Sequence, residues 1–139
     1  MLVDLVDETY VVAPPHRLAP VFADPRTWAA WWPDLTLEVA EDRGLKGMRW
    51  RVTGSLAGTS EVWLEPHRDG TVVHLYLRLD PATADDAGRG RRAADRLRRG
   101  FAVDFKRRLS ALKDELEAGR ELGVRTRSRR EGASGGERG

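Results

Sequence analysis

The spacing of hydrophobic residues changes twice along the chain, and each change marks a different kind of element. Residues 3–13 are mainly β-branched, aromatic and polar and end at Pro14, which predicts a first strand. Apolar residues then recur at helical spacing from Pro15 to Asp24, and a tryptophan-rich group follows as far as Pro33. We therefore expect one strand followed by two short helices.

Between residues 35 and 80 the apolar positions alternate with polar ones, as in strands that bury one face. Four such runs are separated by turn-forming residues, notably at 54–58 and 66–70, which indicates antiparallel hairpins. The predicted inner face of this sheet consists of Met48, Trp50, Val52, Val62, Leu64, Val73, Leu75 and Leu77.

The opposite face of the predicted strands is polar. If it pointed inward, it would form a charged cavity, but burying five charges is costly unless all are paired. We therefore expect this face to meet solvent. It consists of Arg49, Arg51, Glu61, Trp63, Glu65, His74, Tyr76 and Arg78.

Helical spacing returns over residues 91–119, where one apolar stripe includes Leu97, Phe101 and Phe105. We expect this helix to lie across the sheet, with the stripe facing Trp50, Leu75 and Leu77, because no other element is long enough to cover the apolar face. Beyond it, residues 123–139 are Gly, Ser, Arg and Glu with almost no apolar side chains. The sequence thus predicts a single domain over residues 1–122 and a disordered basic tail over 123–139.

Composition narrows the class of protein. The chain has 139 residues, of which 40% are hydrophobic and 33% charged, as in one globular domain. With 0 Cys and 3 scattered His, a disulfide scaffold, thiol chemistry and thiolate metal sites are excluded, and we expect no cofactor and no metal. No apolar run approaches the ~20 residues of a membrane span, and the first residues lack the features of a signal peptide. We expect a cytoplasmic protein.

Two features together resemble a known protein family. One is the order of elements: a strand, two short helices, four strands and a long helix. The other is a set of short motifs at and between the two helices, namely Pro14-Pro15, Asp24-Pro25, Trp28 and Trp31-Trp32-Pro33. The chain resembles the polyketide cyclase/dehydrase and lipid-transport family of START-like (Bet v 1-like, SRPBCC) proteins. The resemblance implies an α+β helix-grip fold, in which a curved antiparallel sheet grips the last helix around an apolar cavity for lipids, polyketides or isoprenoid-like molecules. The family commonly has six strands between the short helices and the last helix, whereas this chain has four in residues 35–80, a departure that bears on the cavity size.

Two interpretations of the apolar positions stay open. By periodicity alone, the sheet face and the helix stripe fill a core; with the resemblance, they line a pocket. On the helix, Asp104 and Arg108 are four residues apart, so they either brace the helix as an ion pair or serve a ligand, with Arg108 binding a carboxylate or polarising a carbonyl. The candidate ligand-binding residues are Phe22, Trp28, Trp31, Met48, Trp50, Val52, Val62, Leu64, Leu75, Leu77, Leu97, Phe101, Asp104, Phe105 and Arg108.

Three functions follow from these positions. The first is binding of a hydrophobic small molecule by a monomer or homodimer. The second is a cyclase or dehydratase in which Arg108 or Tyr10 polarises a carbonyl, although Ser60 is the only good polar candidate on the apolar face and no catalytic set accompanies it. The third is nucleic-acid or regulatory-partner binding, since residues 85–139 carry 16 Lys and Arg against 10 Asp and Glu. Nucleic acid is the less favoured of these partners, because part of that charge is neutralised within the helix.

Overall fold

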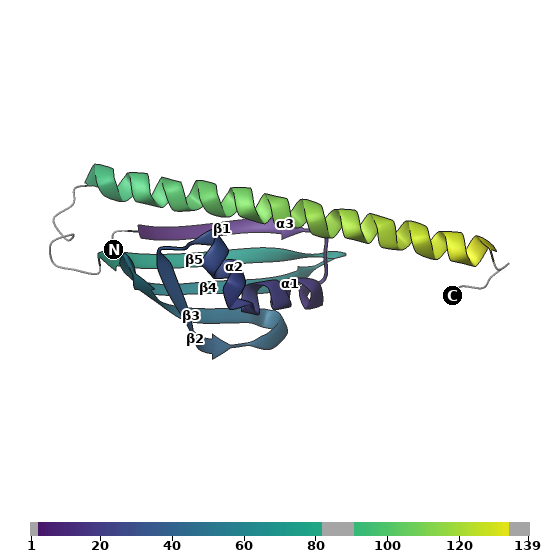
Figure 1. Ribbon diagram of the computed structural model, residues 1–139, viewed down its shortest axis with the longest axis horizontal. Helices are drawn as coiled ribbons and strands as arrows, with labels where there is room; N and C mark the ends of the chain where they lie inside the picture. The colour runs from purple at the N-terminus through teal and green to yellow at the C-terminus, as the bar shows by residue number, and fades with distance from the viewer. Residues whose placement is uncertain (1–2, 82–90, 134–139) are drawn as a thin grey trace.

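The computed structural model of the protein describes residues 3–81 and 91–133, with side chains on the last helix described as far as Ala118. The order of its elements confirms the predicted strand, two helices, four strands and long helix, with one added turn of 3-10 helix (Figure 1). The elements are β1 (Val3–Val11), α1 (Pro15–Ala23), α2 (Pro25–Trp31), β2 (Leu35–Asp42), η1 (Gly44–Lys46), β3 (Gly47–Gly54), β4 (Leu56–His67), β5 (Gly70–Pro81) and α3 (Arg91–Ala133).

The strands form one antiparallel sheet in the order β1-β5-β4-β3-β2. The first strand therefore pairs with the last, from Val3 opposite Leu79 to Val11 opposite Thr71. Consecutive strands from β2 to β5 are hairpin neighbours, as the turn residues predict. At the start of β3, Gly47 has φ of +120° and an added Cβ would lie 1.9 Å from the Val62 carbonyl oxygen, so this close strand approach requires glycine.

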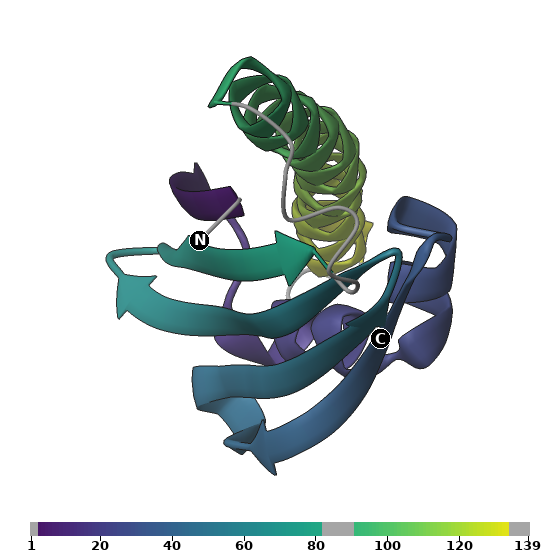
Figure 2. The same ribbon diagram turned by 90° about the vertical axis from the view of Figure 1, so that its left-hand side faces the viewer.

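The predicted inner face of the sheet is the core. Each of its eight side chains is at most 4% exposed, whereas Arg49, Arg51 and Arg78 on the opposite face are exposed. Figure 2, seen nearly along α3, shows the sheet curving around the side on which the helices lie. The strand register derived from hydrophobic alternation is therefore confirmed.

The last helix runs alongside β1, as both ribbon views show (Figures 1 and 2). Polar contacts hold the two elements together: Lys106 Nζ lies 3.0 Å from Asp7 Oδ1 and donates a 2.7 Å hydrogen bond to Thr9 Oγ1. Further along, the Glu117 carboxylate accepts a 3.0 Å hydrogen bond from the backbone N–H of Val12. These contacts fix α3 over the β1 edge of the sheet.

The predicted partners of the α3 aromatic residues need correction. The sequence predicts that Phe101 and Phe105 face Trp50, but their ring contacts are with Trp31 and Trp32 at the end of α2. Trp50 is instead in contact with Trp28, which in turn contacts Trp32. Leu97, Phe101 and Phe105 nevertheless pack with the core, and Phe105 is fully buried.

The predicted boundary of the helix also needs correction. α3 continues to Ala133, through most of the segment 123–139 expected to be disordered. Arg and Glu are good helix formers, the segment has no proline, and each residue added to an existing helix gains a backbone hydrogen bond. Figure 1 shows this end of α3 extending beyond the sheet. Within the described residues, no helix is long and apolar enough to cross a membrane.

Candidate ligand site between the sheet and the last helix

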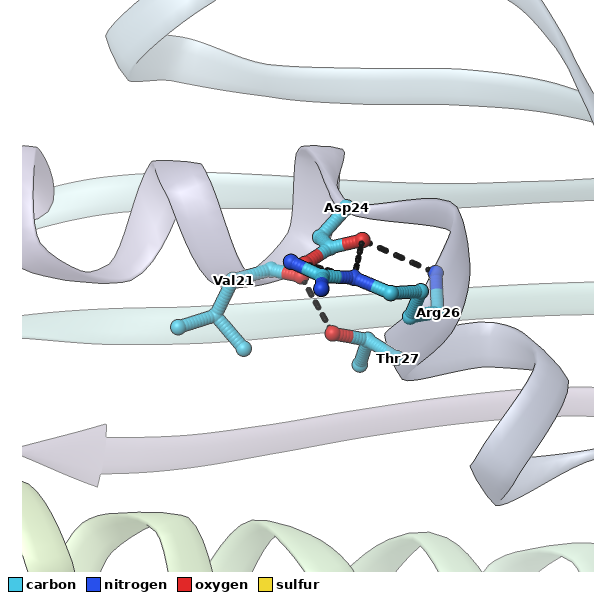
Figure 3. A network of polar contacts seen from close by, with 4 residues as sticks. All are labelled: Val21, Asp24, Arg26 and Thr27. Carbon is cyan, nitrogen blue, oxygen red and sulfur yellow. Dashed lines mark hydrogen bonds and ion pairs between the residues drawn. The ribbon is translucent and has the colours of Figure 1, made fainter.

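The corner between α1 and α2 is built by the Asp24-Pro25 sequence. The Asp24 carboxylate caps α2 by accepting a 2.9 Å hydrogen bond from the Arg26 backbone N–H, and it also pairs with the Arg26 guanidinium at 2.8 Å (Figure 3). These hydrogen bonds from Arg26 lower the pKa of Asp24 and raise the pKa of Arg26. Thr27 Oγ1 donates to the Val21 carbonyl at 2.7 Å, which closes the corner. The direction of α2, and with it the placement of its tryptophans, is set here.

The centre of the site is an aromatic cluster around Trp28. Its ring centroid lies 5.9 Å from that of Phe22, 5.5 Å from Trp31, 5.3 Å from Trp32 and 4.9 Å from Trp50. The Trp28 indole N–H donates a 2.8 Å hydrogen bond to the Phe22 carbonyl, so its polar atom is satisfied although the ring is buried. The predicted site residues Phe22, Trp28, Trp31 and Trp50 therefore come together in space.

The last helix joins the same cluster. Trp32 lies 5.7 Å from Phe101 and 6.4 Å from Phe105, and Trp31 lies 6.0 Å from Phe105, measured between ring centroids. Several apolar side chains that pack on the core keep part of their surface exposed to solvent, in contrast to the buried sheet face. We call four of them the apolar seam: Trp31 of α2, Leu37 of β2, and Leu97 and Phe101 of α3.

Two buried polar atoms at this site lack a hydrogen-bond acceptor among the described residues: Trp32 Nε1 and Arg108 Nε. The sequence pointed to Arg108 but not to Trp32. Nothing in the sequence distinguishes a tryptophan whose indole N–H lacks an acceptor from one whose indole N–H is paired. The predicted pairing of Asp104 with Arg108 is corrected by the structure, in which the ion pair of Asp104 is with Arg107 at 3.8 Å. Arg108 is thus left half-buried on the helix stripe with an unsatisfied donor.

The polar residues considered for carbonyl chemistry have other partners. Ser60 is buried on the inner face as expected, but its hydroxyl donates a 3.1 Å hydrogen bond to the Tyr76 carbonyl. Tyr10 faces the outer side of the sheet, and its hydroxyl donates to Asp69 Oδ1 at 2.7 Å near the turn between β4 and β5. A carbonyl-polarising role for Tyr10 in the interior is therefore wrong.

The outer sheet face differs from expectation at His74, which is only 5% exposed. Its ring stacks on Trp63 with centroids 4.2 Å apart, and Nε2 lies 2.9 Å from Glu65 Oε1. Nδ1 lies 3.1 Å from Glu8 Oε2, although without hydrogen-bond alignment. The imidazole is covered by its cross-strand neighbours, Trp63 on β4 and Glu8 on β1. These two residues can be recognised as neighbours of His74 only once the strand order is known.

No group of three or more His, Cys, Asp or Glu side chains in the described segments is arranged to hold a metal ion.

Comparison with solved structures identifies this arrangement. The Aha1 dimer from Colwellia psychrerythraea is similar over 84% of this chain and 98% of its own, with 18% identity and a TM-score of 0.58. Protein Ms6760 from Mycobacterium smegmatis (80% and 90% covered, 14% identity, TM-score 0.55) and TTHA0849 from Thermus thermophilus (84% and 98% covered, 18% identity, TM-score 0.53) are also similar. The chain shares the fold of these structures, a helix-grip α+β fold in which a curved antiparallel sheet holds a long C-terminal helix.

The helix-grip assignment confirms the fold expected from the sequence resemblance. No family model matches the chain, and no curated protein matches it by sequence. At these identities the solved structures establish the shared fold, so what the site binds has to be argued from its own residues.

Proposed function

We propose that this helix-grip protein binds a hydrophobic small molecule, of the lipid, polyketide or isoprenoid-like kind, between its sheet and α3. The observation that carries the proposal is the apolar seam, where Trp31, Leu37, Leu97 and Phe101 pack on the core yet keep part of their surface in solvent. Sites for apolar ligands are lined by such aromatic and aliphatic side chains, with a few polar atoms that orient the ligand.

The seam residues come from three elements, α2, β2 and α3. Two of them contact the aromatic cluster directly: Trp31 lies 5.5 Å from Trp28, and Phe101 lies 5.7 Å from Trp32, between ring centroids. A ligand that separated α3 from α2 would exchange the ring contacts of Phe101 and Phe105 for contacts with its own apolar surface. The cyclase or dehydratase alternative gains no such support, because Tyr10 and Ser60 are engaged elsewhere.

The test is a titration with Nile red, a neutral dye whose fluorescence rises in apolar surroundings, followed by displacement with long-chain alcohols and acids. Quenching or a spectral shift of tryptophan emission gives a second readout, because four of the five tryptophans lie in the cluster. We expect saturable binding that Phe101→Ala and Trp50→Ala each weaken by about tenfold, the effect of removing a well-packed aromatic contact.

Val103→Ala is the matched control, since Val103 lies on the same helix but is 56% exposed on its outer side. It should bind the dye as the wild type does. Absence of saturable binding in the folded wild-type protein would refute the proposal, and so would equal weakening by Val103→Ala and Phe101→Ala.

A further inference from the structure

The cluster at the end of α2 holds a polar atom that the fold itself does not use. The Trp32 side chain is 3% exposed, and its indole N–H has no acceptor in the described part of the protein. The neighbouring Trp28 is equally buried, but its indole N–H donates to the Phe22 carbonyl. A buried donor without an acceptor is destabilising, so an unpaired one in an otherwise satisfied cluster calls for an explanation.

A second unpaired donor approaches from α3. Arg108 Nε is buried without an acceptor, and the carboxylate expected to engage Arg108 is paired with Arg107 instead. Arg108 lies about one helical turn beyond Phe105, whose ring centroid is 6.4 Å from that of Trp32. Side chains on a helix lean toward its N-terminus, which directs the Arg108 stem back toward the turn that carries Phe105. Both donors are thus related to Phe105: Trp32 through its ring contact, and Arg108 through its place one turn further along α3.

The chemistry of the two donors selects an acceptor. Both can only donate, and one belongs to a guanidinium that is charged at any accessible pH. A neutral carbonyl would satisfy the hydrogen bonds, but a carboxylate would also balance the charge, and charge-assisted hydrogen bonds are about twice as strong as neutral ones. In apolar surroundings this difference is enlarged, because charge is poorly screened there.

We propose that Trp32 Nε1 and Arg108 Nε together bind the carboxylate of an amphipathic acid, whose apolar body lies along the aromatic cluster. This inference rests on the proposed function and adds the class of ligand to it. It assigns Trp32 as an orienting residue that fixes where the carboxylate sits. Nothing in the arrangement calls for the ligand to react.

The experiment compares ligands that differ only at the head group. Dodecanoic acid, dodecanol and methyl dodecanoate are each used at neutral pH to displace Nile red from the wild type and from two variants. Trp32→Phe keeps an aromatic ring but removes the donor, and Arg108→Met keeps most of the stem but removes the guanidinium. The matched controls are Trp31→Phe, in the half-buried neighbour, and Arg107→Met, which removes the same charge from a side chain that is 73% exposed.

We expect the wild type to bind the acid about tenfold more tightly than the alcohol or the ester, as a charge-assisted hydrogen bond allows. Trp32→Phe and Arg108→Met should each remove most of this preference, measured as the ratio of acid to alcohol affinity within the same variant, whereas both controls should keep the wild-type ratio. If Arg108→Met does not fold, Arg108→Gln, which keeps a polar side chain but removes the charge, should show the same loss.

Equal affinity of the wild type for acid and alcohol would overturn the carboxylate assignment and leave the proposed function standing. The same holds if Arg107→Met lowers the preference as much as Arg108→Met, because the effect would then be that of general surface charge. If neither the dye nor any dodecyl compound binds, the proposed function and this inference are both refuted.

Discussion

Replacing Phe105 with alanine tests whether α3 is gripped by the rest of the fold. Phe105 is fully buried, and its ring lies 6.0 Å from Trp31 and 6.4 Å from Trp32 between centroids. Truncating a buried phenylalanine costs about 3–5 kcal/mol, because its transfer energy is lost and a cavity remains. A domain has about 5–15 kcal/mol in total, so the variant should lose a large part of its stability. For a chain of this size that corresponds to a Tm lower by roughly 10–20 °C.

The measurement is thermal unfolding followed by circular dichroism, supported by urea titration to obtain the free energy of unfolding. Val103→Ala serves as the control, because Val103 is 56% exposed two residues earlier on the same helix. Its stability should stay within ~0.5 kcal/mol of the wild type. If the two variants melted at similar temperatures, α3 would not be packed on the core as described, and the helix-grip interpretation of this chain would be refuted.

The remaining predictions concern three single positions. Gly100→Ala should raise the free energy of unfolding, measured by urea titration, by about 0.5–1 kcal/mol, because an added Cβ at this exposed helix position meets nothing within 4 Å. Gly47→Ala should instead prevent folding, because its Cβ would overlap the Val62 carbonyl oxygen. Asp24→Asn should lower Tm at neutral pH. Because Arg26 lowers the pKa of Asp24, the ionised Asp24 carboxylate stabilises the folded state at any pH above the ordinary pKa of an aspartate. This contribution is lost as the pH falls through the lowered pKa of the folded state. The Tm values of the variant and the wild type should therefore converge in acid. A pH-independent difference would contradict this account.

Much of the fold could be read from the sequence because it depends on local periodicity. Alternation along β3 to β5 assigned side chains to the inner face, and the eight residues predicted there are buried in the structure, whereas Val39 of the edge strand β2 is 52% exposed. The Asp24-Pro25 pair likewise predicted the end of the first short helix, and α1 ends at Ala23. The end of α3 was missed, since low hydrophobicity argues against burial but does not prevent Arg- and Glu-rich residues from continuing a helix to Ala133.

The partners of individual side chains were decided by the tertiary structure alone. His74 was assigned to solvent, but β4 and β1 bring Trp63 and Glu8 against it, and strand order cannot be derived from the alternation within one strand. Arg108 was expected to pair with Asp104, yet Asp104 pairs with Arg107, because spacing along a helix allows either neighbour. The unsatisfied donor of Trp32 emerges only when α2 and α3 meet, since whether a polar atom finds an acceptor depends on every element packed around it.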